Sequence, residues 1–188
     1  MESMGDRILA ATIEAASVHG IGRLSVADVA KRAGLSRPTV YKHFASKDAL
    51  VAAAVRREAA TFVDTVTSAI APIDDARDAV AAAVLLTLEL ARQHPLLDRV
   101  VRTEPERLVP LLTTDEGLVL PLVRVPVEAV MAERFPGLDD VVRRRTADVL
   151  VRLLISFALN APDDPPDVVA NVVAGLLVDG VRAAERAA

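Results

Sequence analysis

Apolar residues recur with the spacing of an amphipathic helix through most of this chain. The longest such segments cover residues 46–70, 77–94, 138–160 and 167–185, and a shorter one covers 96–102. Helix-breaking residues separate these segments: Pro72 with the pair Asp74-Asp75, Pro95, and the run APDDPP. No segment alternates with the two-residue period of a half-buried strand. The pattern therefore predicts an all-α fold.

Prolines interrupt the helical pattern between residues 106 and 135, at Pro110, Pro121 and Pro126. Proline lacks the N–H that a helix interior requires, and its ring crowds the preceding turn. We therefore expect short or kinked helices in this stretch, with a loop near residues 113–117.

Two short helices and a tight turn are predicted between Ser25 and Lys47. Ser25 is an N-cap with Asp28 three residues later, which is the spacing of a capping box. Gly34 stands where a helix commonly ends in a left-handed residue, and Ser36 offers a second N-cap two residues later. The turn is then about three residues long, a length typical of a helix-turn-helix.

The second of these helices has an apolar face and an unusual polar face. Val40 and Phe44 are four residues apart and are expected to point inward. The remaining positions carry basic, aromatic and hydroxyl side chains, which can reach phosphates and base edges: Arg37, Thr39, Tyr41, Lys42 and His43. Pro38 is tolerated in the first helical turn. This face indicates DNA binding, although helix-turn-helix patterns also occur in proteins that do not bind DNA.

The run from Arg7 to Leu50 resembles the DNA-binding domain of the tetracycline-repressor (TetR) family of bacterial one-component regulators. The resemblance covers about a quarter of the chain. It rests on matching order and spacing at Gly20, Ser25-Val26, Val29-Ala30, Ala33-Gly34-Leu35-Ser36, Thr39-Val40-Tyr41, His43-Phe44 and Ser46-Lys47. It implies an N-terminal three-helix helix-turn-helix DNA-binding domain over residues 1–48 and a C-terminal helical-bundle domain for effector binding and dimerisation over residues 49–188.

The resemblance also implies roles for individual residues. Tyr41 and His43 would contact phosphates, and Lys47, at the start of the next helix, would clamp another. The candidate DNA-binding residues are Ser25, Ser36, Arg37, Pro38, Thr39, Tyr41, Lys42, His43 and Lys47. Ala16 departs from the family pattern, which usually places a bulky aromatic there, so we expect Ile13 and Phe44 to fill that part of the core.

Charge and composition agree with a nucleic-acid-binding head on an acidic body. Residues 1–48 contain seven Lys or Arg and five Asp or Glu, and all the lysines of the chain lie there. The whole chain has a net charge of −4, so any attraction to DNA is local. Cysteine is absent, which excludes disulfides and thiolate chemistry. We expect a cytoplasmic protein without a signal peptide, membrane span, cofactor, metal site or catalytic residues.

The last two helical segments have apolar faces broader than one core contact requires, and we expect a homodimer there. The candidate interface residues are Leu153, Phe157, Val169, Val173, Leu176 and Leu177. Gly175 and Gly180 would allow two helices to approach closely. The alternative is that all these side chains belong to the core of a single chain.

By analogy with the family, an effector pocket is expected between the helices of the C-terminal domain. The candidate lining residues are Phe62, Val66, Leu86, Leu90, Leu108, Leu122, Ser156 and Asn160. Few of them are charged or aromatic, which favours a lipophilic compound.

The sequence thus predicts a DNA-binding transcriptional regulator: a repressor that a small lipophilic effector releases from a palindromic operator. One alternative is a DNA-binding protein without a ligand, or one controlled by a protein partner. Another is a helical-bundle enzyme. The sequence has neither the Glu-x-x-His pairs of carboxylate-bridged metal sites nor a Gly-x-Ser-x-Gly elbow, which argues against the enzyme.

Overall fold

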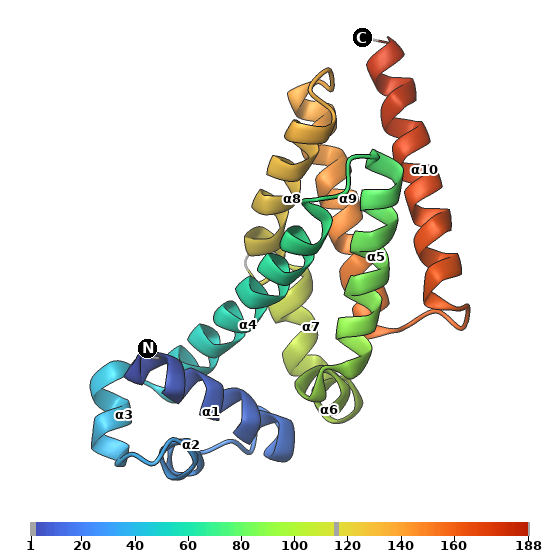
Figure 1. Ribbon diagram of the computed structural model, residues 1–188. Helices are drawn as coiled ribbons and strands as arrows, with labels where there is room; N and C mark the ends of the chain where they lie inside the picture. The colour runs from blue at the N-terminus through green and yellow to red at the C-terminus, as the bar shows by residue number, and fades with distance from the viewer. Residues whose placement is uncertain (1–2, 115–116, 188) are drawn as a thin grey trace. The chain divides into compact units, whose positions relative to one another are not determined.

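The fold consists of α-helices, as predicted (Figure 1). The structure is a computed structural model that describes residues 3–114 and 117–187, apart from the side chains at positions 108, 111 and 187. Within these residues there are ten helices and no strand. The helices are α1 (Met4–His19), α2 (Val26–Arg32), α3 (Arg37–His43), α4 (Lys47–Ile70), α5 (Ala76–Gln93), α6 (Pro95–Thr103), α7 (Pro105–Thr113), α8 (Leu120–Arg134), α9 (Asp140–Leu159) and α10 (Pro166–Ala187).

The helical segments predicted from periodicity are confirmed to within one or two residues at most ends. Pro95 separates α5 from α6 as expected, and it occupies the first turn of α6, where no N–H is needed. Pro105, whose place was not predicted from the sequence, occupies the first turn of α7 in the same way. Pro110 and Pro126 differ, since each lies inside a helix, α7 and α8 respectively. The predicted loop near 113–117 falls between α7 and α8, and residues 115–116 lie outside the described part of the chain.

The helices form two compact units. One contains the residues up to 59 together with 94–119, and the other contains 60–93 together with 120–188. Helix α4 therefore contributes its first half to one unit and its second half to the other. The expected division at residue 48 stays a prediction, and the structure adds that α6 and α7 cluster with the N-terminal helices.

The first unit has a core of small and aliphatic side chains. Ile8, Val29 and Leu50 are fully buried, and α1 packs against both α2 and α6. Ala16 is 3% exposed, so the position that the family usually fills with an aromatic is closed. Ile13 and Phe44, expected to fill that part of the core, are only partly buried. The contribution of α6, whose Val100 is fully buried, was not foreseen from the sequence.

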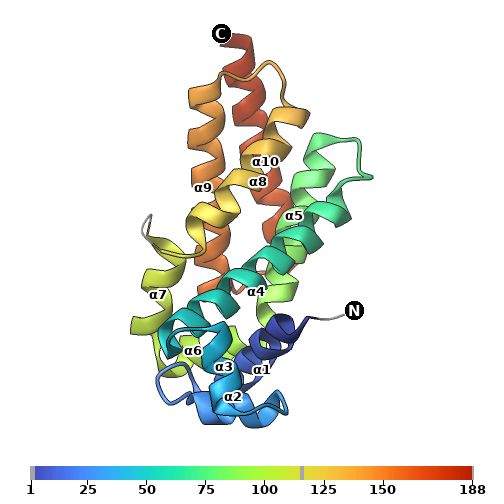
Figure 2. The ribbon, with the colours of Figure 1, turned by 90° about the vertical axis from the view of Figure 1, so that its left-hand side faces the viewer.

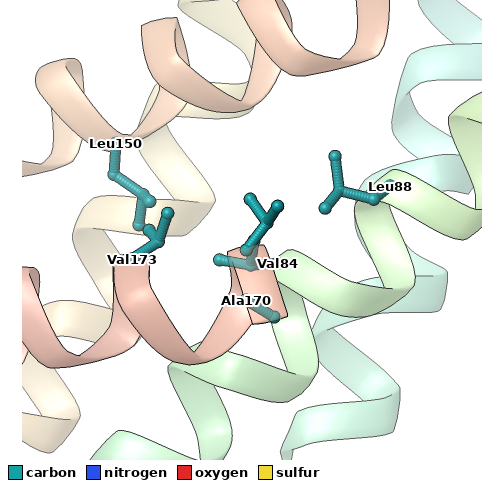
Figure 3. Close-up of a cluster of buried hydrophobic side chains, with 6 residues drawn as sticks. Val84, Leu88, Leu150, Ala170 and Val173 are labelled. Carbon is teal, nitrogen blue, oxygen red and sulfur yellow. The ribbon is translucent and has the colours of Figure 1, made fainter. Parts of the chain in front are cut away.

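The second unit is a helical bundle in which α10 packs along α5 and α8 packs along α9 (Figures 1 and 2). Its central cluster joins α5, α9 and α10: Leu150 and Val173 point toward each other, and the other members are Val84, Leu88, Val169 and Ala170 (Figure 3). A second cluster surrounds Met131, Phe135 and Val178.

One arginine joins the end of α8 to the end of α4 within the second unit. The Arg134 guanidinium donates to the carbonyl oxygens of Ile70 at 2.8 Å and Ile73 at 2.6 Å. The last carbonyls of a helix have no partner inside the helix, and a cation there also complements the helix dipole. Arg134 therefore caps the C-terminus of α4 from a neighbouring element.

Candidate nucleic-acid interface

The two caps predicted for the helix-turn-helix are present. The Asp28 N–H donates to Ser25 Oγ at 3.2 Å, and the Ser25 N–H donates back to Asp28 Oδ2 at 3.2 Å, which completes the capping box of α2. The pKa of Asp28 lies below its usual value, mainly because the Ser25 side chain donates a hydrogen bond to the carboxylate. Ser25 is therefore the N-cap of α2.

The turn after α2 depends on Gly34. Its φ is 63°, a left-handed conformation that costs a residue with a Cβ about 1–2 kcal/mol. The following Leu35 N–H donates to the carbonyl of Ala30 at 2.9 Å, which satisfies one of the last carbonyls of α2. The chain can then reverse within three residues and begin α3 at Arg37.

Helix α3 separates into the two faces that the sequence predicted. Val40 is 1% exposed and forms the inner face. Ser36 caps the helix, since its Oγ accepts the Thr39 N–H at 3.2 Å. The outer face carries five exposed side chains: Arg37, Pro38, Tyr41, Lys42 and His43. Thr39 is partly exposed, and its hydroxyl lies 2.8 Å from Ser36 Oγ.

This outer face combines positive charge with a half-exposed aromatic ring. Tyr41 is 51% exposed, so its ring and hydroxyl are accessible to a partner. Lys42 and His43 lie in the last turn of α3, where the helix dipole favours a cation. The arrangement can bind an anionic surface with cations and present Arg37 and Thr39 to base edges.

Lys47 has a contact that sequence reasoning missed. Its Nζ donates to the carbonyl oxygen of Gly22, in the loop between α1 and α2, at 2.8 Å. The N–H of the same Gly22 donates to Glu104 Oε2 at 2.7 Å. Gly22 is 25 residues from Lys47 and 82 residues from Glu104 in the sequence, and no periodic pattern connects these residues.

The structure divides the predicted dimer residues between the inside and the outside of the second unit. Val169 and Val173 are 8% and 6% exposed and belong to the central cluster of their own chain. Leu153, Phe157 and Leu177 are partly buried against that cluster. Leu176, in contrast, is 74% exposed.

Other apolar side chains on α9 and α10 are also exposed: Val141, Val149, Val168 and Val172. The two glycines expected to permit close helix approach differ as well. A Cβ on Gly175 would lie 2.6 Å from the Arg77 guanidinium, so this glycine makes room for a side chain of its own chain. Nothing lies within 4 Å of a Cβ on Gly180.

The predicted pocket residues are not all enclosed. Val66 is buried, and Phe62, Leu86, Leu90 and Leu122 are partly buried. Ser156 and Asn160, expected to supply polar groups to the pocket, are both exposed. The side chain of Leu108 lies outside the described residues.

Two further properties concern the described residues alone. Among them, no group of three or more His, Asp and Glu side chains is arranged to hold a metal ion. Within the same ranges, every helix is too short or too polar to cross a membrane.

Comparison with curated proteins finds mycobacterial relatives. The chain is 30% identical to an uncharacterized HTH-type transcriptional regulator of Mycobacterium bovis over 104 residues. These residues make up 55% of this chain and 52% of that protein. Over 96 residues, it is 30% identical to another such regulator of Mycobacterium tuberculosis, covering 51% of this chain and 48% of that protein. The chain thus spans about half the length of the curated relatives it matches.

Solved structures share the fold across nearly the whole chain. The TetR family repressor AlkX from Dietzia sp., implicated in biodegradation of n-alkanes, has a TM-score of 0.76 at 23% identity, covering 95% of this chain and 97% of AlkX. The regulator FadR from Bacillus subtilis, in complex with stearoyl-CoA, has a TM-score of 0.63 at 19% identity, covering 93% of this chain and 98% of FadR.

Two family models match successive parts of the chain. The model for bacterial regulatory proteins of the tetR family matches residues 8–54, which contain α2 and α3. The model for the bacterial tetracyclin repressor C-terminal domain matches residues 75–178, more than half of the chain. The all-α fold and the helix-turn-helix agree with both. The chain therefore belongs to the TetR family of bacterial regulatory proteins.

Proposed function

We propose that this protein is a sequence-specific DNA-binding transcriptional regulator whose helix α3 enters the major groove. The observation that carries the proposal is the outer face of α3, where Arg37, Tyr41, Lys42 and His43 are exposed on a helix fixed by the buried Val40. Major grooves are wide enough to admit such a helix. Family membership supports the same function.

The side chains have different roles in this complex. Arg37, Pro38, Thr39 and Lys42 face base edges, whereas Tyr41 and His43 contact phosphates. Lys47 clamps a further phosphate: an ammonium carries three N–H donors, so its bond to Gly22 is compatible with a second bond to DNA. Ser25 and Ser36 contribute as helix caps, which place the first turns of α2 and α3.

The regulator acts in the cytoplasm as a homodimer on a palindromic operator. Exposed apolar side chains on α9 and α10, with Leu176 at 74%, Val149 at 63% and Val172 at 56%, support an interface on these helices. Such side chains gain free energy when a second copy covers them. A two-fold axis through this interface places two α3 helices for two half-sites, and these must be inverted repeats.

The effector we propose is a small lipophilic compound that releases a repressor from its operator. The partly buried side chains of Phe62, Leu86, Leu90 and Leu122 in the second unit are apolar. Two proteins of the same fold support this ligand class, since AlkX is implicated in n-alkane degradation and the FadR structure contains stearoyl-CoA. The effector changes operator affinity only if it binds the two states of the protein with different affinity.

Selection of bound sequences from random double-stranded DNA tests the DNA-binding function. We expect the wild type to enrich an inverted repeat. Arg37→Ala and Lys42→Ala should each relax the preference at one position of the repeat, by about 1–3 kcal/mol. Arg102→Ala removes the same charge from an exposed arginine on α6 and serves as the control. Enrichment of no sequence would contradict the proposal.

Thermal melting with candidate ligands separates the effector hypothesis from its alternative. A compound that binds the folded state raises the melting temperature. Long-chain acyl-CoA and free fatty acids are the probes, and a sugar phosphate is the control. If no lipophilic probe shifts the melting temperature or the operator affinity, ligand-independent or partner-controlled regulation is favoured.

A further inference from the structure

The loop between α1 and α2 is held by side chains from two distant helices. Its residue Gly22 accepts a hydrogen bond from Lys47 Nζ at 2.8 Å through its carbonyl and donates one to Glu104 Oε2 at 2.7 Å through its N–H. Lys47 is the first residue of α4, and Glu104 stands between α6 and α7. All these residues belong to the same compact unit. Gly22 therefore connects the α6–α7 junction to the start of α4.

The Glu104 side chain binds this loop instead of capping the helix that follows it. It is the C-cap of α6 and the N-cap of α7, yet its side chain makes no capping hydrogen bond to α7. The side chain is only 15% exposed, and the Arg107 Nε lies 3.6 Å from its Oε2. A hydrogen bond to an ionised carboxylate is shorter and about twice as strong as one between neutral groups. The Glu104 carboxylate thus fixes the position of the Gly22 amide.

The loop has space for this carboxylate because two of its residues, Gly20 and Gly22, are glycines. A Cβ on Gly20 would lie 2.1 Å from Glu104 Oε1, and a Cβ on Gly22 would lie 3.1 Å from Glu104 Oε2. Gly20 also has a φ of 81°, which residues with a Cβ rarely adopt. Both glycines therefore fit a loop that Glu104 approaches closely.

Helix α6 is joined to α4 at its other end as well. His94, the N-cap of α6, has its Nε2 3.0 Å from Glu58 Oε1 on α4. His94, at the start of α6, thus contacts α4 directly. Glu104, at the end of α6, is linked to Lys47 of α4 through Gly22. A fixed α6 holds the Lys47 side chain at a defined place beside the recognition helix, which ends four residues before Lys47 at His43.

We propose that Glu104 is a positioning residue for DNA binding: by holding Gly22, it fixes the Lys47 ammonium where it clamps a phosphate. This inference rests on the proposed DNA-binding function. It assigns a role in operator affinity to a residue outside the helix-turn-helix, at the junction of α6 and α7.

The test compares Glu104 variants in operator binding over a range of salt concentrations. Glu104→Ala removes the acceptor, and Glu106→Ala, an exposed glutamate two residues away, is the control for the lost charge. Relative to that control, we expect Glu104→Ala to weaken binding roughly tenfold, as for the loss of one charge-assisted hydrogen bond. The salt slope should fall by about 0.9, the value of one phosphate contact.

Two further variants decide whether the effect passes through Lys47. Lys47→Ala should lower the salt slope by the same amount, and the double variant with Glu104→Ala should bind no more weakly than Lys47→Ala alone. Glu104→Asp keeps the charge and supplies a good N-cap for α7, but its carboxylate is one methylene short of Gly22. It should weaken binding as Glu104→Ala does, and it decides the question alone if the alanine variant does not fold.

The outcomes separate this inference from the proposed function. If the wild type binds no DNA, the function itself is wrong. If the wild type binds, the inference is overturned by an unchanged salt slope in Lys47→Ala or in every Glu104 variant that folds, or by additive effects in the double variant. Circular dichroism of each variant confirms that only folded proteins are compared.

Discussion

Replacement of Leu176 by glutamate should dissociate the proposed dimer without unfolding the chain. Leu176 exposes 74% of its surface on α10. Burial of a leucine side chain contributes about 1.5–3 kcal/mol, and a two-fold interface contains the residue twice. Because 74% of each side chain is available for burial, removing both leucines costs about 2–4 kcal/mol per dimer. This is roughly 30-fold to 700-fold in the dimer dissociation constant at about 1.4 kcal/mol per tenfold. The buried carboxylates add to this cost.

Sedimentation of the wild type and Leu176→Glu over a range of protein concentrations measures the change. Val125→Glu is the matched control, since Val125 is 67% exposed but lies on α8. Leu177→Glu is the contrasting variant: Leu177 packs against both clusters of the second unit, so this change should lower the stability of the single chain. Equal dimer dissociation constants for Leu176→Glu, Val125→Glu and the wild type would refute the interface on this face of α10.

Three other predictions concern stability. The pKa of Glu58 lies below its ordinary value of 4.5, mainly because of its hydrogen bond with His94. The resulting stability is present above that pH and is lost as the pH falls through the lower pKa of the folded state. The melting temperature of Glu58→Gln should therefore fall less than that of the wild type as the pH is lowered from about 5. Leu88→Ala, at a residue 1% exposed, should cost about 2–5 kcal/mol in chemical denaturation, against about 0.5 kcal/mol or less for Val125→Ala. Gly34→Ala should cost about 1–2 kcal/mol from backbone strain alone, because nothing lies within 4 Å of the added Cβ; a loss below about 0.5 kcal/mol would contradict the left-handed conformation.

The helix-turn-helix could be predicted because its signals are local. Ser25 and Asp28 are three residues apart, and Gly34 marks the end of α2 by its own backbone requirement. Each signal involves residues that meet as soon as the helix forms. The same is true of the long helices, whose apolar spacing predicted their extent.

The contacts made by Gly22 could not be predicted, because they join residues that only the folded chain brings together. The Glu104–Gly22 hydrogen bond spans 82 residues, and neither residue type indicates a partner. The sequence also could not show which apolar side chains of α10 are buried and which are exposed. Periodicity shows that Val169 and Val173 share a face, but a helix with apolar residues on two faces does not show which of them its own chain covers.

The neighbours Leu176 and Leu177 give α10 a strict limit on changes in its length. One side chain is exposed and the next packs inside, because successive residues of a helix point about 100° apart. Deletion of a single residue earlier in α10 would turn every later residue by that angle and direct solvent-facing positions into the core. An insertion of seven residues, close to two full turns, would keep the inner and outer positions nearly in place. In evolution, this helix can therefore change length only in steps close to whole turns.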